Sequence, residues 1–269
     1  MSLPLAPPFA RLVRRLLAAI VPAGARARRL RREFTRWSVH DESGLRLYRS
    51  LVPPGGLVFD VGANVGRRVR VFHRIPARVV AIEPQPRCVA VLNRLFGGHP
   101  QTTIEPVAVG AASGKADLHL ADVDTISTMD PSFAEATRRS GRFAGHRWSS
   151  RAVVPVTTLD ALIARHGEPD FVKIDVEGFE AEVLKGVSRP LRAVSVEFVP
   201  ELWERSVACI RYLAALGPVE TNLALGESMH FESERWMGVE DLAQRLEALA
   251  QRVDLFGDVY IRAAGASSL

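Results

Sequence analysis

A chain of 269 residues, with 47% apolar and 24% charged residues, has the size and composition of a globular enzyme with one domain and an appendage. Its two cysteines, Cys88 and Cys209, are far apart in the sequence and form no CxxC pair. This argues against a disulfide framework or a zinc site, and it favours a reducing, cytoplasmic setting. No apolar run reaches the roughly 18 residues of a membrane-spanning helix.

Positive charge is concentrated at the amino-terminal end. Nine arginines and one acid give residues 1–36 a net charge of +8, so the rest of the chain carries −3 of the total of +5. Leu12, Leu16 and Ile20 follow one another at a spacing of four residues with arginines between them, the pattern of a basic amphipathic helix. We therefore expect a basic helical arm over residues 1–44. It either packs on the domain or makes peripheral contact with an anionic membrane through residues 1–36. A nucleic-acid partner is not expected, because the body of the chain is mildly acidic.

From about residue 45 onward, short β-branched runs alternate with segments of helical period, which is typical of a parallel sheet with crossover helices. The arm should join this domain, residues 45–269, through a linker at about 38–44, and a polar insertion should occupy about 122–151. The expected central strands are 57–61, 79–82, 103–109, 171–175, 194–198, 219–223 and 258–262. The expected helices are 65–73, 86–96, 158–165, 179–185, 203–216 and 239–252, and 116–121 should pair with 152–156 as a hairpin. These elements predict an α/β fold, a seven-stranded and mostly parallel sheet with helices on both faces.

The strongest local signal is the segment 59–66, an apolar strand that runs into a glycine-bearing turn and then a helix. Gly62 allows a tight turn and a close approach of a ligand to the main chain. Asp60 is an acceptor for an ammonium group, and the helix after Gly66 offers free N–H groups to a carboxylate. This combination suits the amino-acid half of S-adenosylmethionine. It differs from the G-x-G-x-x-G pattern of a nicotinamide dinucleotide site, where an acid would face a pyrophosphate.

A second signal is Glu83, directly after the strand 79–82. A carboxylate at the end of the second strand is placed to accept hydrogen bonds from both ribose hydroxyls of a bound nucleoside. Glu83 alone does not distinguish S-adenosylmethionine from NAD.

Four segments resemble the FkbM family of methyltransferases: DVGANVG at 60–66, IEP at 82–84, VAVG at 107–110 and FVKIDVEGFE at 171–180, which continues into VLKG at 183–186. The resemblance covers about residues 45–263. It implies a Rossmann-like class I methyltransferase fold and methyl transfer from S-adenosylmethionine to oxygen, usually on a sugar or a secondary metabolite. Carried over by position, the cofactor site would consist of Asp60, Gly62, Asn64 and Gly66 at the methionine end, Glu83 and Pro84 at the ribose, Ala108 and Val109 at the adenine edge, and Asp175. Arg67 and Arg68 depart from the small or hydroxyl residues that the family usually has there.

Transfer to a hydroxyl requires that its proton leaves as the methyl group arrives, so the site needs a base or a metal ion. Asp175 and Glu177 follow the strand 171–175, and Glu197 lies at the end of the next strand. Carboxylates at adjoining strand ends could act as a general base or bind a divalent cation such as magnesium. His230, in a non-helical segment between late elements, is the alternative base, with an ordinary pKa of about 6.5.

The second half of the insertion contains five arginines, two aromatic residues and no acid. These residues are Arg138, Arg139, Arg142, Phe143, Arg147, Trp148 and Arg151. They predict either a clamp for an anionic acceptor or a solvated loop.

Together with the family resemblance, which implies transfer to oxygen, the residues favour a small-molecule O-methyltransferase whose acceptor carries a hydroxyl group. The alternatives are a nucleic-acid or protein methyltransferase, a nicotinamide-dependent oxidoreductase and a binding module without catalysis. An Asn-Pro-Pro-Tyr or Asp-Pro-Pro-Tyr tetrapeptide, which would indicate amino-directed methylation of nucleic acid, is absent from the sequence.

Overall fold

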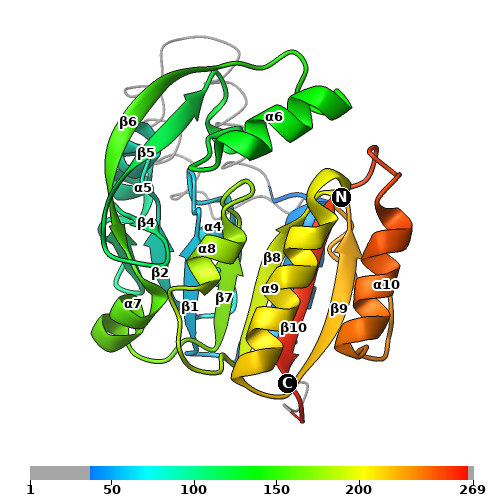
Figure 1. Ribbon diagram of the computed structural model, residues 1–269. Helices are drawn as coiled ribbons and strands as arrows, with labels where there is room; N and C mark the ends of the chain where they lie inside the picture. Colours follow the sequence, from blue (N-terminus) through cyan, green and yellow to red (C-terminus); the bar gives the residue numbers. More distant parts are fainter. Residues whose placement is uncertain (1–36, 266–269) are drawn as a thin grey trace.

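The computed structural model describes residues 37–265, and a seven-stranded sheet forms its centre (Figure 1). The strands lie in the order β3-β2-β1-β7-β8-β10-β9. Their bounds are β1 (Leu57–Val61), β2 (Arg78–Ile82), β3 (Thr102–Glu105), β7 (Phe171–Ile174), β8 (Ala193–Phe198), β9 (Val219–Leu225) and β10 (Gly257–Ala263). β10 is antiparallel to both of its neighbours, and the other pairs are parallel. The strand order reverses between β1 and β7, which is where open α/β sheets bind their ligands.

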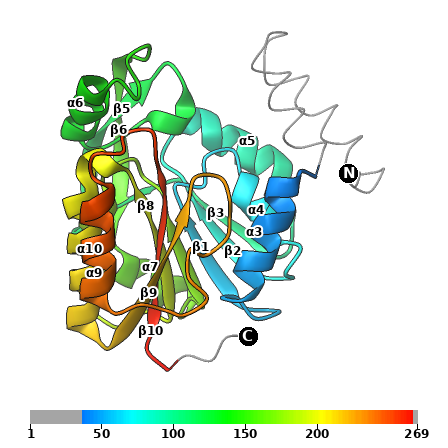
Figure 2. The ribbon, with the colours of Figure 1, turned by 90° about the vertical axis from the view of Figure 1, so that its right-hand side faces the viewer.

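Helices cover both faces of this sheet (Figure 2). One face carries α3 (Val39–Arg49), α4 (Arg67–Phe72) and α5 (Pro86–Phe96), and the other carries α7 (Leu159–His166), α8 (Glu180–Leu184), α9 (Trp203–Leu216) and α10 (Val239–Leu249). Alternate residues of a strand supply the two cores. In β2, Val80 and Ile82 join the α7–α10 core, whereas Val79 and Ala81 join the α3–α5 core. The expected α/β fold is thereby confirmed.

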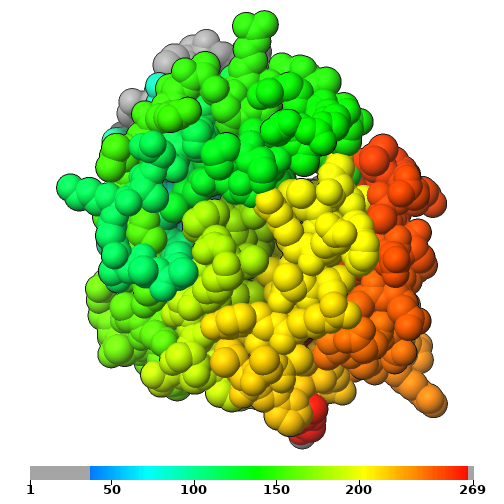
Figure 3. Space-filling view, in the orientation of Figure 1, coloured from blue at the N-terminus to red at the C-terminus, as the bar shows by residue number. Residues whose placement is uncertain are grey.

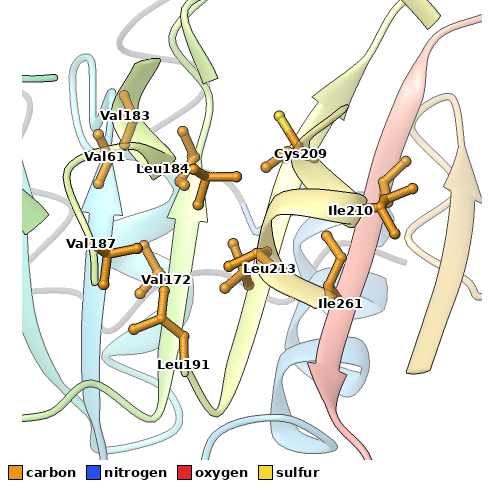
Figure 4. Packing of buried hydrophobic residues seen from close by; sticks show 14 of the residues in the cluster. Val61, Val172, Val183, Leu184, Val187, Leu191, Cys209, Ile210, Leu213 and Ile261 are labelled. Carbon is orange, nitrogen blue, oxygen red and sulfur yellow. The ribbon is translucent and has the colours of Figure 1, made fainter. Parts of the chain in front are cut away.

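Figure 4 shows the larger core at close range. Val61 lies beside Val183, Val172 lies beside Val187 and Leu191, and Leu213 of α9 lies over the neighbouring strands. Burial of these side chains holds α8 and α9 on the sheet. This packing fixes the positions of the carboxyl ends of β7 and β8. Within residues 37–265, no helix combines the length and the apolar character that crossing a membrane requires.

The expected linker at 38–44 is instead part of α3, which begins one residue after Ser38. Ser38 and Asp41 form a capping box, in which each side chain accepts a hydrogen bond from the other residue's backbone N–H. Asp41 also forms a buried ion pair with Arg70 of α4, at 2.7 Å. The packed domain therefore starts before residue 45, and residues 1–36 of the arm predicted at 1–44 lie outside the described residues.

A second sheet of three strands stands beside the large one, in the order β4-β6-β5. Its strands are β4 (Ala108–Val109), β5 (Gly114–Ala121) and β6 (Trp148–Thr157). The single strand expected at 103–109 is thus two strands, β3 and β4, with Pro106 between them, which has no N–H for a ladder. The predicted hairpin is confirmed, with Ala116 opposite Val154. The insertion between its strands folds into a short 3-10 turn, η1 (Asp124–Ile126), and the helix α6 (Pro131–Ser140).

Candidate active site

A cavity of about 240 Å³ lies at the carboxyl ends of the parallel strands, where the order of the sheet reverses. β1 and β2 form one side of it, β7 and β8 form another, and the insertion and the start of β10 complete the wall. The wall includes Gly62, Asn64, Glu83, Pro84, Ala108, Val109, Asp175, Glu177, Glu197 and Asp258. Most of the residues that the sequence singles out are therefore brought together in one place.

The turn after β1 brings the main chain close to the end of β7. Gly62 has a φ of +82°, and a Cβ atom there would lie 1.9 Å from the carbonyl oxygen of Asp175. Any side chain at this position would separate the two strand ends, so glycine is required. Gly66 also has a positive φ, but a Cβ there would meet Phe96 and Leu92 of α5. Gly66 thus serves helix packing and does not line the cavity.

Glu83 is nearly inaccessible to solvent, at 2% exposure, yet it borders the cavity. Its two carboxylate oxygens accept hydrogen bonds from the backbone N–H groups of Asn64 and Gln85, each at 2.8 Å. Burial raises the pKa of Glu83 to about 7, although these hydrogen bonds favour the ionised form. Each oxygen retains a further lone pair, so the carboxylate can accept two more donors from a ligand.

Asp60 lies behind the turn, on the face of β1 that α3–α5 cover. It is 1% exposed, and neither of its carboxylate oxygens has a hydrogen-bond partner within the described part of the chain. Burial raises its pKa to about 6, and the positive charge of Lys173 opposes that rise. Asp60 is not part of the cavity wall. Its carboxylate is therefore buried without a hydrogen-bond donor from residues 37–265.

Three carboxylates meet at the ends of β7 and β8. One oxygen each of Asp175, Glu177 and Glu197 lies within 4.8 Å of the other two. Lys173 Nζ donates to Asp175 Oδ2 at 2.6 Å, whereas Glu177 Oε2 is buried with no partner in residues 37–265. Burial raises the pKa of Glu177 well above its ordinary value, and the charge of Glu197 adds to the rise. Burial also raises the pKa of Glu197 well above its ordinary value, and the negative charge of Asp175 raises it further.

A profile of the methyltransferase FkbM domain matches residues 60–253, which is most of the chain and contains the whole of this carboxylate cluster. The chain belongs to the FkbM methyltransferase family. The fold and the family resemblance expected from the sequence are both confirmed.

Two proteins described as methyltransferases are similar to this FkbM chain. The hexuronic acid methyltransferase AglP of Haloferax volcanii is 29% identical over 172 residues, which cover 61% of this chain and 64% of AglP. The methyltransferase sdnD of Sordaria araneosa is 29% identical over 179 residues, or 58% of this chain and 69% of sdnD. The match therefore spans less than two thirds of AglP.

Among solved structures, the precorrin-6y C5,15-methyltransferase of Geobacter metallireducens aligns with a TM-score of 0.42 and 12% identity, covering 82% of this chain and 87% of that one. Cofactor-bound Rv0187 from MTB aligns with a TM-score of 0.42 and 14% identity, covering 96% and 90%. Likeness at this level says nothing of the acceptor.

The FkbM chain contains charged site residues to which sequence reasoning assigned no role. Lys173 is buried in β7, and Asp258 of β10 lies opposite Glu197 of β8. Arg68, at the start of α4, also lines the cavity. The lysine within the buried strand 171–174 was an available signal, because a lysine is rarely buried without acidic partners. Asp258 gave no comparable signal, since its neighbours come from distant parts of the sequence.

Besides Asp60 and Gly66, which were expected at the cofactor and lie outside the cavity wall, two further expectations are not met in the cavity of this FkbM domain. His230 is exposed and lies outside the wall, where its Nδ1 contacts the carbonyl oxygen of Ser228 at 2.5 Å. None of the insertion's arginines lines the cavity. Instead Arg138 stacks on Trp148, Arg139 pairs with Glu135, and Arg142 pairs with Glu201. The insertion faces the cavity with Asp124, Thr125, Ser127 and Met129.

Proposed function

We propose that this FkbM domain transfers a methyl group from S-adenosylmethionine to a hydroxyl of a small molecule. The observation that carries the proposal is the arrangement of the cavity wall. A buried carboxylate suited to a ribose, Glu83, stands at one side, and the cluster of Asp175, Glu177 and Glu197 stands at the other. A nucleoside cofactor and an acceptor would then meet between them.

The residues present fit the cofactor. Glu83 retains lone pairs for two ribose hydroxyls, and Pro84, Ala108 and Val109 offer an apolar edge for the adenine. The unpartnered carboxylate of Asp60 lies behind the turn and outside the cavity wall, so it would compensate an ammonium group by its charge and not by direct contact. When bound, S-adenosylmethionine supplies an electrophilic methyl group, and the chain supplies orientation and a place for the proton.

The proton of the acceptor hydroxyl passes to the carboxylate of Glu177, with Glu197 beside it. Glu177 and Glu197 lie close together and are half-buried, so the charge of Glu197 raises the pKa of Glu177 and the pair accepts a proton more readily than an exposed carboxylate does. A base with a raised pKa is well matched to this task. Lys173 donates to Asp175, which keeps a positive charge beside the third carboxylate.

The charge of the wall favours a neutral acceptor over an anionic one or a nucleic acid. Acids predominate in the wall, and its arginine, Arg68, contributes positive charge near Asp258 and Glu227. A phosphate or carboxylate beside Glu177 would meet like charge. Because the relative AglP is named for a hexuronic acid, a test of the acceptor should compare neutral sugars with acidic sugars.

The test is transfer of radioactive methyl from S-adenosylmethionine to a panel of a neutral hexose, its methyl glycoside, the matching hexuronic acid, and bulk transfer RNA. We expect label on the neutral sugars and release of S-adenosylhomocysteine in equal amount. Label on the RNA alone would support the nucleic-acid alternative. Failure to bind S-adenosylmethionine at all would refute the proposal.

A further inference from the structure

The turn that carries Glu177 has an unusual backbone. Glu177 has a φ of +57° and Gly178 a φ of +93°, so two successive residues lie in the left-handed region. A residue with a side chain rarely adopts this conformation unless its surroundings enforce it. The position of the Glu177 carboxylate depends on this conformation, because the turn directs the side chain toward Glu197.

A buried threonine of the insertion holds the carbonyl group of Glu177. Thr128 is 0% exposed, and its hydroxyl donates to the Glu177 carbonyl oxygen at 2.7 Å while accepting from the Asp130 N–H at 2.8 Å. Its own backbone exchanges two hydrogen bonds with His119 of β5, at 2.8 and 3.1 Å. Thr128 is therefore anchored in the small sheet and reaches across to the turn at the end of β7.

The next residue of the turn is held from the same side. Arg205 of α9 donates to the Gly178 carbonyl oxygen at 2.9 Å and pairs with Asp130 of the insertion. A Cβ atom on Gly178 would lie 2.7 Å from Phe133 of α6, so the insertion packs directly on the turn. Figure 3 shows the insertion, in green, meeting the yellow surface of α9 above the sheet.

We propose that Thr128 is a positioning residue for the methyl transfer, fixing the Glu177 turn so that its carboxylate can take the acceptor's proton. This inference rests on the proposed function, in which Glu177 accepts that proton. It gives the insertion a role different from acceptor clamping by arginines. The insertion instead supports Glu177, the proton-accepting residue, by a hydrogen bond to the backbone carbonyl group of Glu177.

The matched control lies in the same insertion. Thr137 is also 0% exposed, and its hydroxyl donates to a backbone carbonyl oxygen, that of Phe133, at 2.7 Å. Thr137 lies outside the cavity wall and bonds within its own helix. Thr128→Val and Thr137→Val therefore remove the same kind of buried hydroxyl, but only the first releases the Glu177 turn. Thr128→Ser restores the donor.

With the best acceptor of the panel above, Thr128→Val should lower kcat by roughly 10- to 100-fold, with KM for S-adenosylmethionine within about twofold of wild type. Thr128→Ser should recover most of the rate, and Thr137→Val should retain it. Equal losses in the two valine variants, or no rescue by serine, would overturn the proposal. If Thr128→Val does not fold, Thr128→Cys, the thiol counterpart of Thr128→Ser and a weak donor, takes its place with the same expectations.

A second readout needs no acceptor. The readout is the NMR signal of the Glu177 carboxyl carbon, identified as the signal that is missing in Glu177→Gln. In Thr128→Val this signal should titrate at lower pH, because a released turn exposes the carboxylate to water. The same midpoint in Thr128→Val and Thr137→Val overturns the inference. Glu177→Gln separates the two proposals, since a wild-type rate in that variant refutes Glu177 as the base, whatever Thr128 does to the turn.

Discussion

Lys173 Nζ lies 2.6 Å from Asp175 Oδ2. Lys173 projects from the face of β7 that Phe171 shares with the α3–α5 core, and Asp175 follows directly after the strand ends at Ile174. Burial by itself would lower the pKa of Lys173, but Asp175 and Asp60 more than offset it, so the lysine stays charged. The ammonium group of Lys173 thus lies among the acids of the site. Removal of this group should change the free energy of unfolding and the way in which that free energy depends on pH.

Lys173→Met should lower the free energy of unfolding by about 3–5 kcal/mol at pH 7.5, because buried acids lose their counter-charge. Urea titration measures the loss. At pH 5.5 the deficit should shrink, since a proton on Asp60 can replace the missing positive charge. Lys185→Met is the control, because Lys185 is 54% exposed, and it should change stability by no more than about 0.5 kcal/mol. An equal deficit at both pH values would show that Lys173 contributes packing alone.

Glu83→Ala should weaken S-adenosylmethionine binding by about 1.5–3 kcal/mol, the scale of hydrogen bonds to a charged group. Calorimetry also tests the pH dependence. The pKa of Glu83 is raised to about 7, so below that pH a proton occupies the carboxylate and competes with the ribose hydroxyls. Wild-type affinity should therefore fall between pH 8 and pH 6, and Glu83→Gln should bind weakly at both. Affinity that is independent of pH in the wild type contradicts this assignment.

Glu177→Gln and Glu197→Gln should each lower the transfer rate by about 10²- to 10⁴-fold while cofactor binding stays near wild type. His230→Ala should keep its rate, because His230 is exposed outside the cavity wall. EDTA should have no effect if the carboxylates act as a base. Inhibition by EDTA that magnesium reverses would instead identify a metal site at Asp175, Glu177 and Glu197. A large loss in His230→Ala alone would return the role of base to the histidine.

The unliganded protein should have a higher Tm at pH 6 than at pH 8. Asp60, Glu83 and Glu180 have pKa values raised to about 6, 7 and 7, mainly by burial, so the folded state binds protons in this range that the unfolded chain does not. His73 opposes the trend below pH 6.5, because burial lowers its pKa to about 4. Carboxyls with a lowered pKa, such as Glu227 beside His40, matter only at more acid pH. Calorimetric scans check this, and Asp60→Asn should show a smaller gain.

Deletion of residues 1–36 should abolish salt-sensitive binding to vesicles of anionic lipid, if the net charge of +8 in this segment attaches the enzyme to membranes. Transfer to a soluble sugar should be nearly unchanged, because the deletion spares Trp37 and the whole of α3. Vesicles of neutral lipid are the control. A full-length protein that ignores anionic vesicles at low salt would give the arm a packing role.

Local patterns in the sequence were sufficient wherever one strand or turn determines a residue's position. Glu83 follows a buried strand, and in a parallel sheet the end of that strand faces the ligand. The helix at 203–216 is confirmed residue for residue, because its apolar period lies within the segment and the closing glycine, Gly217, follows it directly. Gly62 is similar, since its turn follows directly from β1.

Relationships between distant segments could not be predicted in the same way. The support of Glu177 by Thr128 joins residues 49 positions apart, and the register of Asp258 against Glu197 joins two strands that are not consecutive. The capping box at Ser38 was readable from the sequence, but it lay inside a stretch expected to be a linker. His230 lies outside the cavity wall because its loop presents Gly226 and Glu227 to the cavity instead.

β10 follows β9 along the chain but lies between β8 and β9 in the sheet, and among the described strands β10 is the sole neighbour of β9. During synthesis, β9 cannot form its native pairing until residues up to Ala263 have left the ribosome. The half of the pocket formed by β1 and β2 can assemble earlier from nearby segments, whereas the half beside Glu197 is completed only when Asp258 arrives. A nascent chain would thus acquire its nucleoside-facing side before its proton-accepting side, and a chain cut short before β10 would present β8 as an open edge prone to aggregation.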